Sequence, residues 1–414
     1  MKQLDDDRTA RIKTMAIRTL NACTTPIGIV AGASHFSQVW TRDACFALWG
    51  SLTLNDYDTV RISLEHITDM VDDIGRVPLR IGTGSMTYSF LRAWYYKKLL
   101  KKDGSWFKEN ITIKHGALYH DDKKRAYALD SGLLLIIGWA LAKEMMPSKE
   151  YEIMATEKRI SFLEKLYEHY RNYENYGLLY QYPYGDWADS IRRIGYSSYV
   201  NSLYYAATKG LSKIIPEKKE HYDEKAIEIK SLINKRLWKN THYADFTNAD
   251  FTPDNFSVDA NMLPLLFGIT DDKKAKLVLS RLNSYPELIS KPGLTVQPYY
   301  DNRHISGFIR LIGMKNYHNG MQWLWLSAIM LLALSRTKDN TASEMIDKTI
   351  SSIDKLLEDN KNKHPYISEV YYNGKPFANF YYESEEPFAW SSGMLISALD
   401  NNKRLVNAIK KITG

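Results

Sequence analysis

The chain of 414 residues has little cysteine and no pair of cysteines spaced for metal binding or redox chemistry. Cys23 and Cys45 form no CxxC motif, and a chain this long can fold without a disulfide. We therefore expect a reducing compartment and a cytoplasmic location. The ten histidines are scattered, without HExxH or HxxxH spacing, so we expect no metal site and no cofactor.

Long hydrophobic runs and nucleotide-binding motifs are also missing. The longest apolar stretch, residues 132–142, is too short to cross a bilayer. The first residues, 1–8, lack the apolar segment of a signal peptide, so we expect no membrane partner. No complete GxGxxG, Walker or GxSxG motif occurs, which disfavours dinucleotide, nucleotide and α/β-hydrolase chemistry.

The chain also has only a small excess of positive over negative charge. The net charge of +7 is spread over solvated helix faces and forms no basic stripe, so we expect no nucleic-acid partner. Aromatic residues, in contrast, are plentiful: 29 tyrosines stand beside 13 phenylalanines and 10 tryptophans. Flat amphipathic rings suit a core or a surface that binds sugar.

Apolar periodicity and helix stop signals predict an all-α protein. We expect helices at 5–22, 41–55, 57–72, 128–145, 149–173, 197–213, 216–238, 257–268, 271–284, 318–336, 340–360 and 386–411, the last one broken near Asn401.

These helices alternate in character. Even-numbered helices are apolar nearly all round, as at 133–141 and 323–334, whereas odd-numbered ones are amphipathic. A helix that is apolar on every side is buried, so the pattern predicts an inner and an outer ring, an (α/α)6 toroid. We expect a single domain over 1–414, with an inserted loop or small subdomain at 74–126. A solenoid is disfavoured because its loops would rarely carry so many aromatic and acidic residues.

The toroid has a chemical consequence, because its six inner helices run parallel and begin at one end. There the long loops would form one cleft. The segment Trp40-Thr-Arg-Asp43 opens one inner helix. Asp43 there suits a helix cap, but with Arg42 and an aromatic ring it also makes a sugar clamp.

Two further segments carry carboxylates. Asp186 and Asp189 lie in a loop rich in aromatic residues, and an aromatic pocket raises a carboxyl pKa, as a general acid requires. Glu369 precedes the turn Asn373-Gly374, whereas Glu385 and Glu386 are explained as first-turn acids of a helix. We therefore prefer Glu369 as the second catalytic carboxylate of a glycosidase. In the segment 317–323, His318 is interpreted as a polar cap lining the cleft rather than a metal ligand.

Taken in order, these segments resemble the (α/α)6-barrel glycoside hydrolases. The closest parallels are the amylo-1,6-glucosidase domain of glycogen-debranching enzymes and the neutral/alkaline invertases of family 100, with family 63 sharing the wider architecture. The matching segments are Trp40-Thr-Arg-Asp43, Leu129-Asp-Ser-Gly132, Asp186-Trp-Ala-Asp189, Tyr317-His-Asn-Gly320 with Trp323, and Ser368-Glu369-Val-Tyr-Tyr-Asn-Gly374 ahead of Ala389-Trp390-Ser391. The invertases' basic pair is displaced to Arg192-Arg193, and the debranching Cys and Gln are absent.

The resemblance implies an inverting hydrolase with Asp189 as general acid and Glu369 as general base, their carboxyl groups about 6.5–9.5 Å apart. The expected substrate is an α-glucosidic oligosaccharide or glucan. The expected substrate-binding residues fall into two groups. Arg42, Asp43, Asp130, His318, Asn319 and Trp390 would line the sugar subsite, and Trp40, Trp187, Tyr196 and Trp323 would stack on sugar rings.

Three alternatives stay open. An invertase-like enzyme would cleave sucrose with the same machinery. A sugar isomerase or epimerase would use the same barrel, but that chemistry commonly needs several catalytic histidines, and only His318 stands at an inner-helix start. A non-catalytic carbohydrate-binding protein could dispense with the paired carboxylates.

Overall fold

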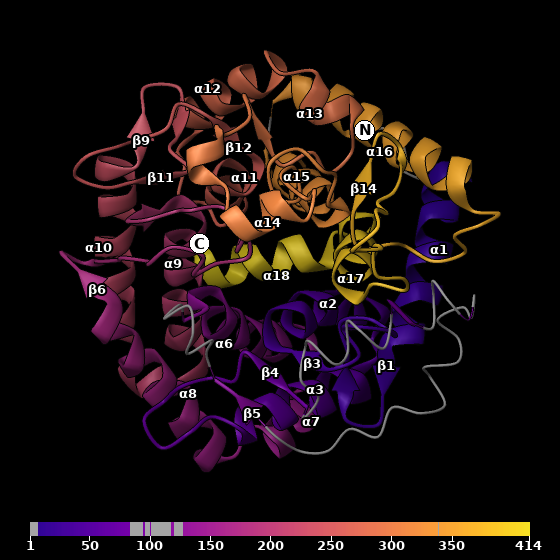
Figure 1. Cartoon of the computed structure of the whole chain (residues 1–414). Helices are drawn as coiled ribbons and strands as arrows, with labels where there is room; N and C mark the ends of the chain where they lie inside the picture. The colour runs from indigo at the N-terminus through magenta and orange to yellow at the C-terminus, as the bar shows by residue number, and fades with distance from the viewer. Residues whose placement is uncertain (1–6, 83–93, 96–99, 101–116, 120–126, 338) are drawn as a thin grey trace.

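The computed structural model describes residues 7–82, 94–95, 100, 117–119, 127–337 and 339–414. Its helices form two concentric rings (Figure 1). Each inner helix packs against the next one along the chain, and the last packs against the first, which closes the ring. The inner helices are α2 (Thr41–Leu54), α6 (Leu129–Met145), α9 (Ser198–Ile214), α11 (Val258–Leu266), α15 (Leu324–Arg336) and α17 (Ala389–Ala398). The predicted (α/α)6 toroid is thus confirmed.

The outer helices are amphipathic and cover the inner ring with one face. They are α1 (Asp7–Cys23), α3 (Tyr57–Asp69), α7 (Ser148–Met154), α8 (Glu157–His169), α10 (Lys219–Arg236), α12 (Asp272–Asn283) and α16 (Asn340–Asn360). Short helical segments lie in the connections: Tyr170–Tyr173, Pro216–Lys218, α13 (Glu287–Ser290), Asn302–His304 and α14 (Gly307–Leu311). Helix α1 packs against α16 and α17, so the start of the chain joins its last hairpin.

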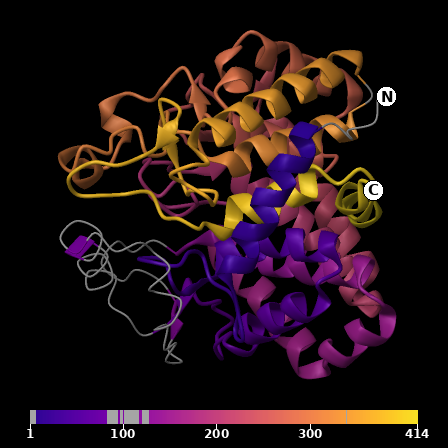
Figure 2. The same cartoon turned by 90° about the vertical axis from the view of Figure 1, so that its right-hand side faces the viewer.

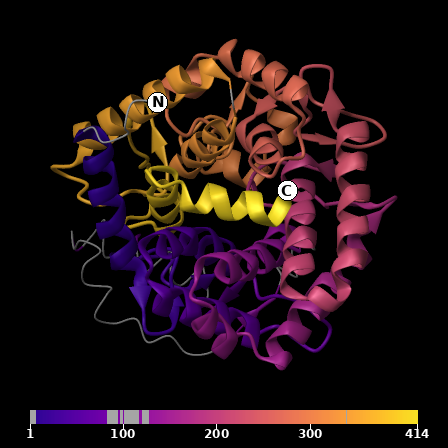
Figure 3. The same cartoon turned by 180° about the vertical axis from the view of Figure 1, so that it is seen from behind.

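One further helix, α18 (Arg404–Thr413), lies across the back of the ring (Figure 3). It packs against α2, α6, α9 and α15. Its apolar face, which includes Leu405 and Ile409, is buried. The break predicted near Asn401 is therefore real, and α18 covers one end of the barrel, which leaves the other end for the loops.

That other end carries the long loops and paired two-residue strands (Figure 2). Each pair is antiparallel: β1 (Thr24–Thr25) with β2 (Gly28–Ile29), β6 (Glu174–Asn175) with β7 (Leu178–Leu179), β8 (Tyr196–Ser197) with β11 (Phe246–Thr247), β9 (Trp238–Lys239) with β10 (His242–Tyr243), β12 (Phe256–Ser257) with β13 (Val296–Gln297), and β14 (Tyr371–Tyr372) with β15 (Lys375–Pro376). Strands β3 (Val39–Trp40), β8 and β12 lead directly into α2, α9 and α11. The pairs thus anchor the chain immediately before these inner helices.

The predicted excursion at 74–126 is only partly described. Strand β4 (Arg80–Ile81) lies between β3 (Val39–Trp40) and β5 (Ala117–Leu118), forming one small sheet. Most of this expected loop or small subdomain lies outside the described residues. The described part places Arg80 beside Trp40, at the start of α2.

Three predicted helix boundaries were wrong. Helix α15 begins at Leu324 rather than residue 318, because the backbone of residues 316–321 closes a turn through hydrogen bonds to the Asn316 carbonyl. The helix predicted at 149–173 is divided into α7, α8 and the short segment Tyr170–Tyr173, and the Thr156 hydroxyl caps α8. Helix α17 begins at Ala389, so Glu385 and Glu386 precede the helix and are not first-turn acids.

Both cysteines are buried, and they form no disulfide with each other. Within the described ranges, no helix combines the length and apolar character needed to cross a membrane.

Candidate active site

The starts of three neighbouring inner helices are joined by one buried ion pair. Arg42 of α2 donates two hydrogen bonds to the carboxylate of Asp130 in α6, at 2.6 and 3.0 Å. The phenol of Tyr199, in the first turn of α9, donates to the same carboxylate at 3.2 Å. A two-pronged arginine–carboxylate contact fixes geometry as well as charge. Asp130 is fully buried, so its two hydrogen bonds hold the Arg42 guanidinium in one orientation on the protein side of the site.

Asp43 adds a second carboxylate at the start of α2. Its side chain is nearly buried, and burial raises its pKa to about 7, while Arg42 lowers it and Glu369 raises it further. The negative charge of Glu369 therefore acts on the Asp43 carboxyl group. A carboxyl group with a pKa near 7 can donate a hydrogen bond to a sugar hydroxyl or accept one from it.

Tryptophan rings from different segments pack together at the end of the barrel. Trp390 stacks on Trp325 with ring centres 4.6 Å apart, and Trp187 meets Trp325 edge-on at 4.8 Å. Trp323 meets Trp187 edge-on at 5.9 Å. The sequence predicted that Trp187 and Trp323 stack on sugar rings and that Trp390 lines the sugar subsite. In the structure these three side chains are each at most 3% exposed. They form a common aromatic floor, in which the indole N–H of Trp390 has no acceptor among the described residues.

Glu369 lies in the segment before β14 and is 1% exposed. Its carboxylate accepts hydrogen bonds from the phenols of Tyr317 and Tyr382 and from the backbone N–H of Glu385, the last at 3.2 Å. Burial raises the pKa of Glu369, whereas His35, the two phenols and the backbone N–H lower it. These donors stabilise the ionised form that a general base needs.

Tyr317 and His318 connect the two candidate catalytic carboxylates. Tyr317 binds Glu369 through its phenol, and Nδ1 of His318 lies 3.8 Å from a carboxylate oxygen of Asp189. His318 Nδ1 accepts a hydrogen bond from the Ser190 backbone N–H at 3.3 Å, and burial lowers the pKa of His318 well below its ordinary value. The ring is therefore neutral and forms no ion pair with Asp189.

Asp189 differs from its predicted environment. The sequence suggested an aromatic pocket that would desolvate it, but its side chain is 56% exposed. The neighbouring tyrosines turn elsewhere: Tyr182 is itself exposed, and Tyr180 packs edge-on against Tyr196. Asp189 thus faces outward while Glu369 is enclosed.

The loop that carries Asp189 is held from below by a buried cluster that the sequence did not reveal. Arg193 contacts Asp186, Asp245 and Asp259 at 3.2, 2.9 and 3.0 Å. Asp186 in turn accepts the backbone N–H of Ala188 at 2.9 Å. The sequence indicated Arg193 only as a displaced basic residue. Its three aspartate partners lie in separate segments of the chain, two in loops and Asp259 in α11, so no local pattern connects all three with Arg193.

Two residues predicted to bind sugar, Asn319 and Tyr196, contact other parts of the protein instead. The amide of Asn319 bonds both backbone groups of Tyr300, at 2.7 and 3.0 Å, so it anchors a loop. Tyr196 packs against Tyr180 and lies under the guanidinium of Arg236. Neither residue has a described contact with Asp189 or Glu369. Trp40 is half-buried, between Phe36 and Arg80.

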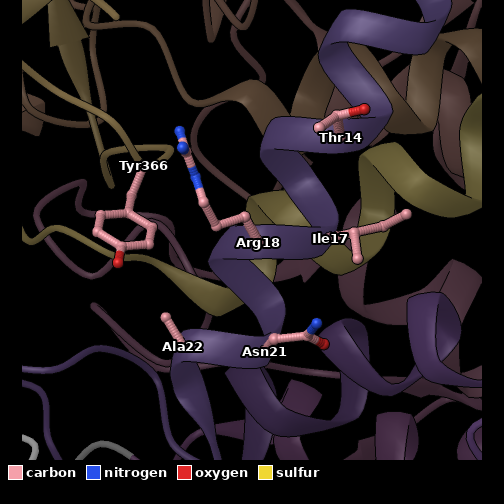
Figure 4. A pocket seen from close by; sticks show the side chains of 6 residues that line it. All are labelled: Thr14, Ile17, Arg18, Asn21, Ala22 and Tyr366. Atoms are coloured by element: carbon pink, nitrogen blue, oxygen red, sulfur yellow. The ribbon is translucent and has the colours of Figure 1, made fainter. Parts of the chain in front are cut away.

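Among the described residues, no group of three or more histidine, cysteine, aspartate or glutamate side chains could hold a metal ion. A surface pocket on α1 is lined by Thr14, Ile17, Arg18, Asn21, Ala22 and Tyr366 (Figure 4). It contains neither candidate carboxylate. Its arginine is already engaged with the Tyr366 ring and the Pro365 carbonyl.

The closed double ring of helices (Figure 1) is the architecture of the six-hairpin glycosidases, and comparisons with known proteins agree. Residues 37–391 match the family described as the mannosylglycerate hydrolase MGH1-like glycoside hydrolase domain. The chain belongs to this family and is a glycoside hydrolase. Comparison with curated protein sequences finds no match.

Several solved structures share the fold. The family 63 mannosylglycerate hydrolase of Thermus thermophilus, in complex with Tris, has a TM-score of 0.64 at 11% identity over 93% of this chain and 99% of that chain. A rhamnosidase from Klebsiella oxytoca with rhamnose bound has a TM-score of 0.64 at 12% identity, over 95% and 63% of the two chains. A bacterial glucoamylase complexed with acarbose has a TM-score of 0.61 at 14% identity, over 99% and 58%.

Proposed function

We propose that this chain hydrolyses an α-glycosidic bond of a small carbohydrate with inversion, using Asp189 as general acid and Glu369 as general base. The observation that carries the proposal is that the two carboxylates lie next to adjacent residues, Glu369 at Tyr317 and Asp189 at His318. Glu369 is buried there, whereas Asp189 is exposed. Two carboxyl groups with different surroundings can divide the acid and base roles.

In this mechanism Asp189 donates its proton to the glycosidic oxygen as the bond to the sugar breaks. Glu369 removes a proton from a water molecule that attacks the anomeric carbon from the opposite face. Tyr317 and Tyr382 hold the base in place. Substrate that covers the exposed Asp189 would exclude water from it, which favours the protonated acid. Arg42 and Asp43 contact sugar hydroxyls.

The neutral substrates suggested by the sequence are α-glucosides such as maltose, isomaltose, trehalose and sucrose. A second candidate is an α-glycoside of a small acid, for which the family's description supplies one argument. The other argument is Arg80, whose guanidinium lies 5.8 Å from the centre of the Trp40 ring at the start of α2. A cation at this position suits a carboxylate on the leaving group.

The test follows product formation from both substrate classes by chromatography and the configuration of the first-formed sugar by proton NMR. We expect the β-anomer from an α-linked substrate. Asp189→Asn and Glu369→Gln should each lower kcat by about two to four orders of magnitude. Asp250→Asn, an exposed loop aspartate, and Glu386→Gln, whose carboxylate bonds His364, serve as controls and should stay within a few-fold. Retention of configuration, or near-normal turnover of either carboxylate variant, contradicts the proposal.

A further inference from the structure

A buried glutamate and a histidine stand directly behind the proposed base. Glu385 is fully buried, and its carboxylate accepts hydrogen bonds from the backbone N–H of Ser34 (2.5 Å), the Ser34 hydroxyl (2.6 Å) and the backbone N–H of His35 (3.1 Å). His35 Nδ1 lies 2.8 Å from the same carboxylate. Gly32 makes room for this side chain, because a Cβ there would lie 2.3 Å from Cγ of Glu385.

The same histidine reaches the base through one phenol. Nε2 of His35 lies 3.4 Å from the Tyr382 oxygen, and the Tyr382 hydroxyl donates its only hydrogen to Glu369. The phenol oxygen can therefore only accept from Nε2, which must carry a hydrogen. Nδ1 faces the Glu385 carboxylate at 2.8 Å. Both ring nitrogens thus face hydrogen-bond acceptors, an arrangement that the doubly protonated imidazole satisfies.

We propose that His35, held as a cation by Glu385, is a positioning residue that keeps Glu369 ionised and oriented for water activation. This inference rests on the proposed role of Glu369 as general base. It adds a second buried carboxylate, Glu385, that serves the reaction without touching substrate.

The charges around Glu369 explain why a cation beside it favours its ionised form. Burial raises the pKa of Glu369, and His35 is the first of the groups that lower it. The other groups facing Glu369 are the phenols of Tyr317 and Tyr382, the backbone N–H of Glu385 and the carboxyl group of Asp43. Since the phenols are neutral and Asp43 is acidic, His35 supplies the opposing charge.

The first test is the pH dependence of kcat/KM, whose acidic limb reports the base in the free enzyme. His35→Asn keeps a donor toward Glu385 but removes the cation and the contact with Tyr382. We expect its acidic limb to move to higher pH by about one unit, and Glu385→Gln to move it in the same direction. Ser34→Ala removes one hydrogen bond to Glu385 without removing a charge, so its limb should not move. A limb for His35→Asn that coincides with that of the unchanged enzyme overturns the inference.

A second test needs no turnover. In protein labelled with nitrogen-15 on histidine, NMR of the ring nitrogens, assigned by comparison with His35→Asn, should show both nitrogens of His35 protonated at neutral pH. Glu369→Gln removes a neighbouring negative charge and should shift the ring-nitrogen resonances of His35. A neutral His35 ring overturns this inference and leaves the hydrolase proposal standing. A doubly protonated ring that responds to Glu369→Gln supports the charge coupling, even if activity assays contradict the proposed reaction.

Discussion

At the scale of single residues, the site combines carboxyl groups whose surroundings differ. Glu369 is enclosed by donors, Asp189 is exposed to water, and Asp43 is buried beside Arg42. The same functional group therefore suits different roles according to what packs around it, and we propose base, acid and sugar contact for these three. The residue type was visible in the sequence, but its environment was not.

Asp43 makes a testable contribution to pH-dependent stability. Its pKa of about 7 in the folded protein exceeds the ordinary value of 3.8, so the folded state binds the extra proton. That stabilisation is present below about pH 4 and is lost as pH rises through 7. Asp43→Asn should therefore raise Tm relative to the unchanged protein at pH 8 and flatten the decline between pH 4 and 7. Its effect on the free energy of unfolding should stay below about 4 kcal/mol, measured by thermal unfolding across pH. An identical pH slope in both proteins contradicts this expectation.

At the scale of elements, inner helices approach closely where glycines meet. Gly50 of α2 faces Gly393 of α17, and a Cβ on Gly393 would lie 2.2 Å from the Ala47 carbonyl oxygen. This contact closes the inner ring and brings the start of α17, with Trp390, against Phe46 of α2 at 5.2 Å. The small residues thus set how near the aromatic floor lies to Arg42 and Asp43.

Gly393→Ala should destabilise the fold, because the neighbouring contacts are backbone atoms that cannot move aside. We expect a loss of about 1–3 kcal/mol in the free energy of unfolding, measured by urea denaturation. Gly307→Ala is the matched control, since the nearest atom to its Cβ is 3.9 Å away at the end of a flexible arginine. Equal midpoints for Gly393→Ala and the unchanged protein would show that the helices can separate without cost.

At the scale of the whole molecule, the ring is closed by contacts between the two ends of the chain. Helix α1 packs against α16 and α17, and Arg11 forms a two-pronged contact with Asp354 at 3.0 and 2.6 Å. Since Arg11 is partly exposed, the buried apolar face of α1 contributes more than this ion pair.

Ile12→Ala tests this closure. Ile12 is 1% exposed in α1, so the substitution should cost about 2–5 kcal/mol. Circular dichroism and tryptophan fluorescence should shift to the same lower midpoint, because Trp49, Trp139 and Trp325 lie in inner helices of the ring that α1 helps to close. Ile227→Ala, at a position 70% exposed in α10, is the control and should leave both midpoints unchanged. A shift in circular dichroism without one in fluorescence would mean that α1 unfolds separately from the ring.

The sequence by itself determined the toroid, because helix periodicity, capping and apolar character are local properties of the chain. It also singled out Asp189, Glu369 and the segments that begin the inner helices. It misjudged the start of α15, where a turn through Asn316 replaces the expected first helical turns. It also treated Glu385 as a helix-terminal acid.

Only the tertiary structure decided what each functional side chain faces. Glu385 reaches Ser34 and His35 across roughly the whole length of the chain, and Arg193 gathers aspartates from separate segments. Such contacts depend on how the ring closes, which no local pattern specifies. Burial and charge pairing therefore appear only when distant segments meet, and they separate the enclosed Glu369 from the exposed Asp189.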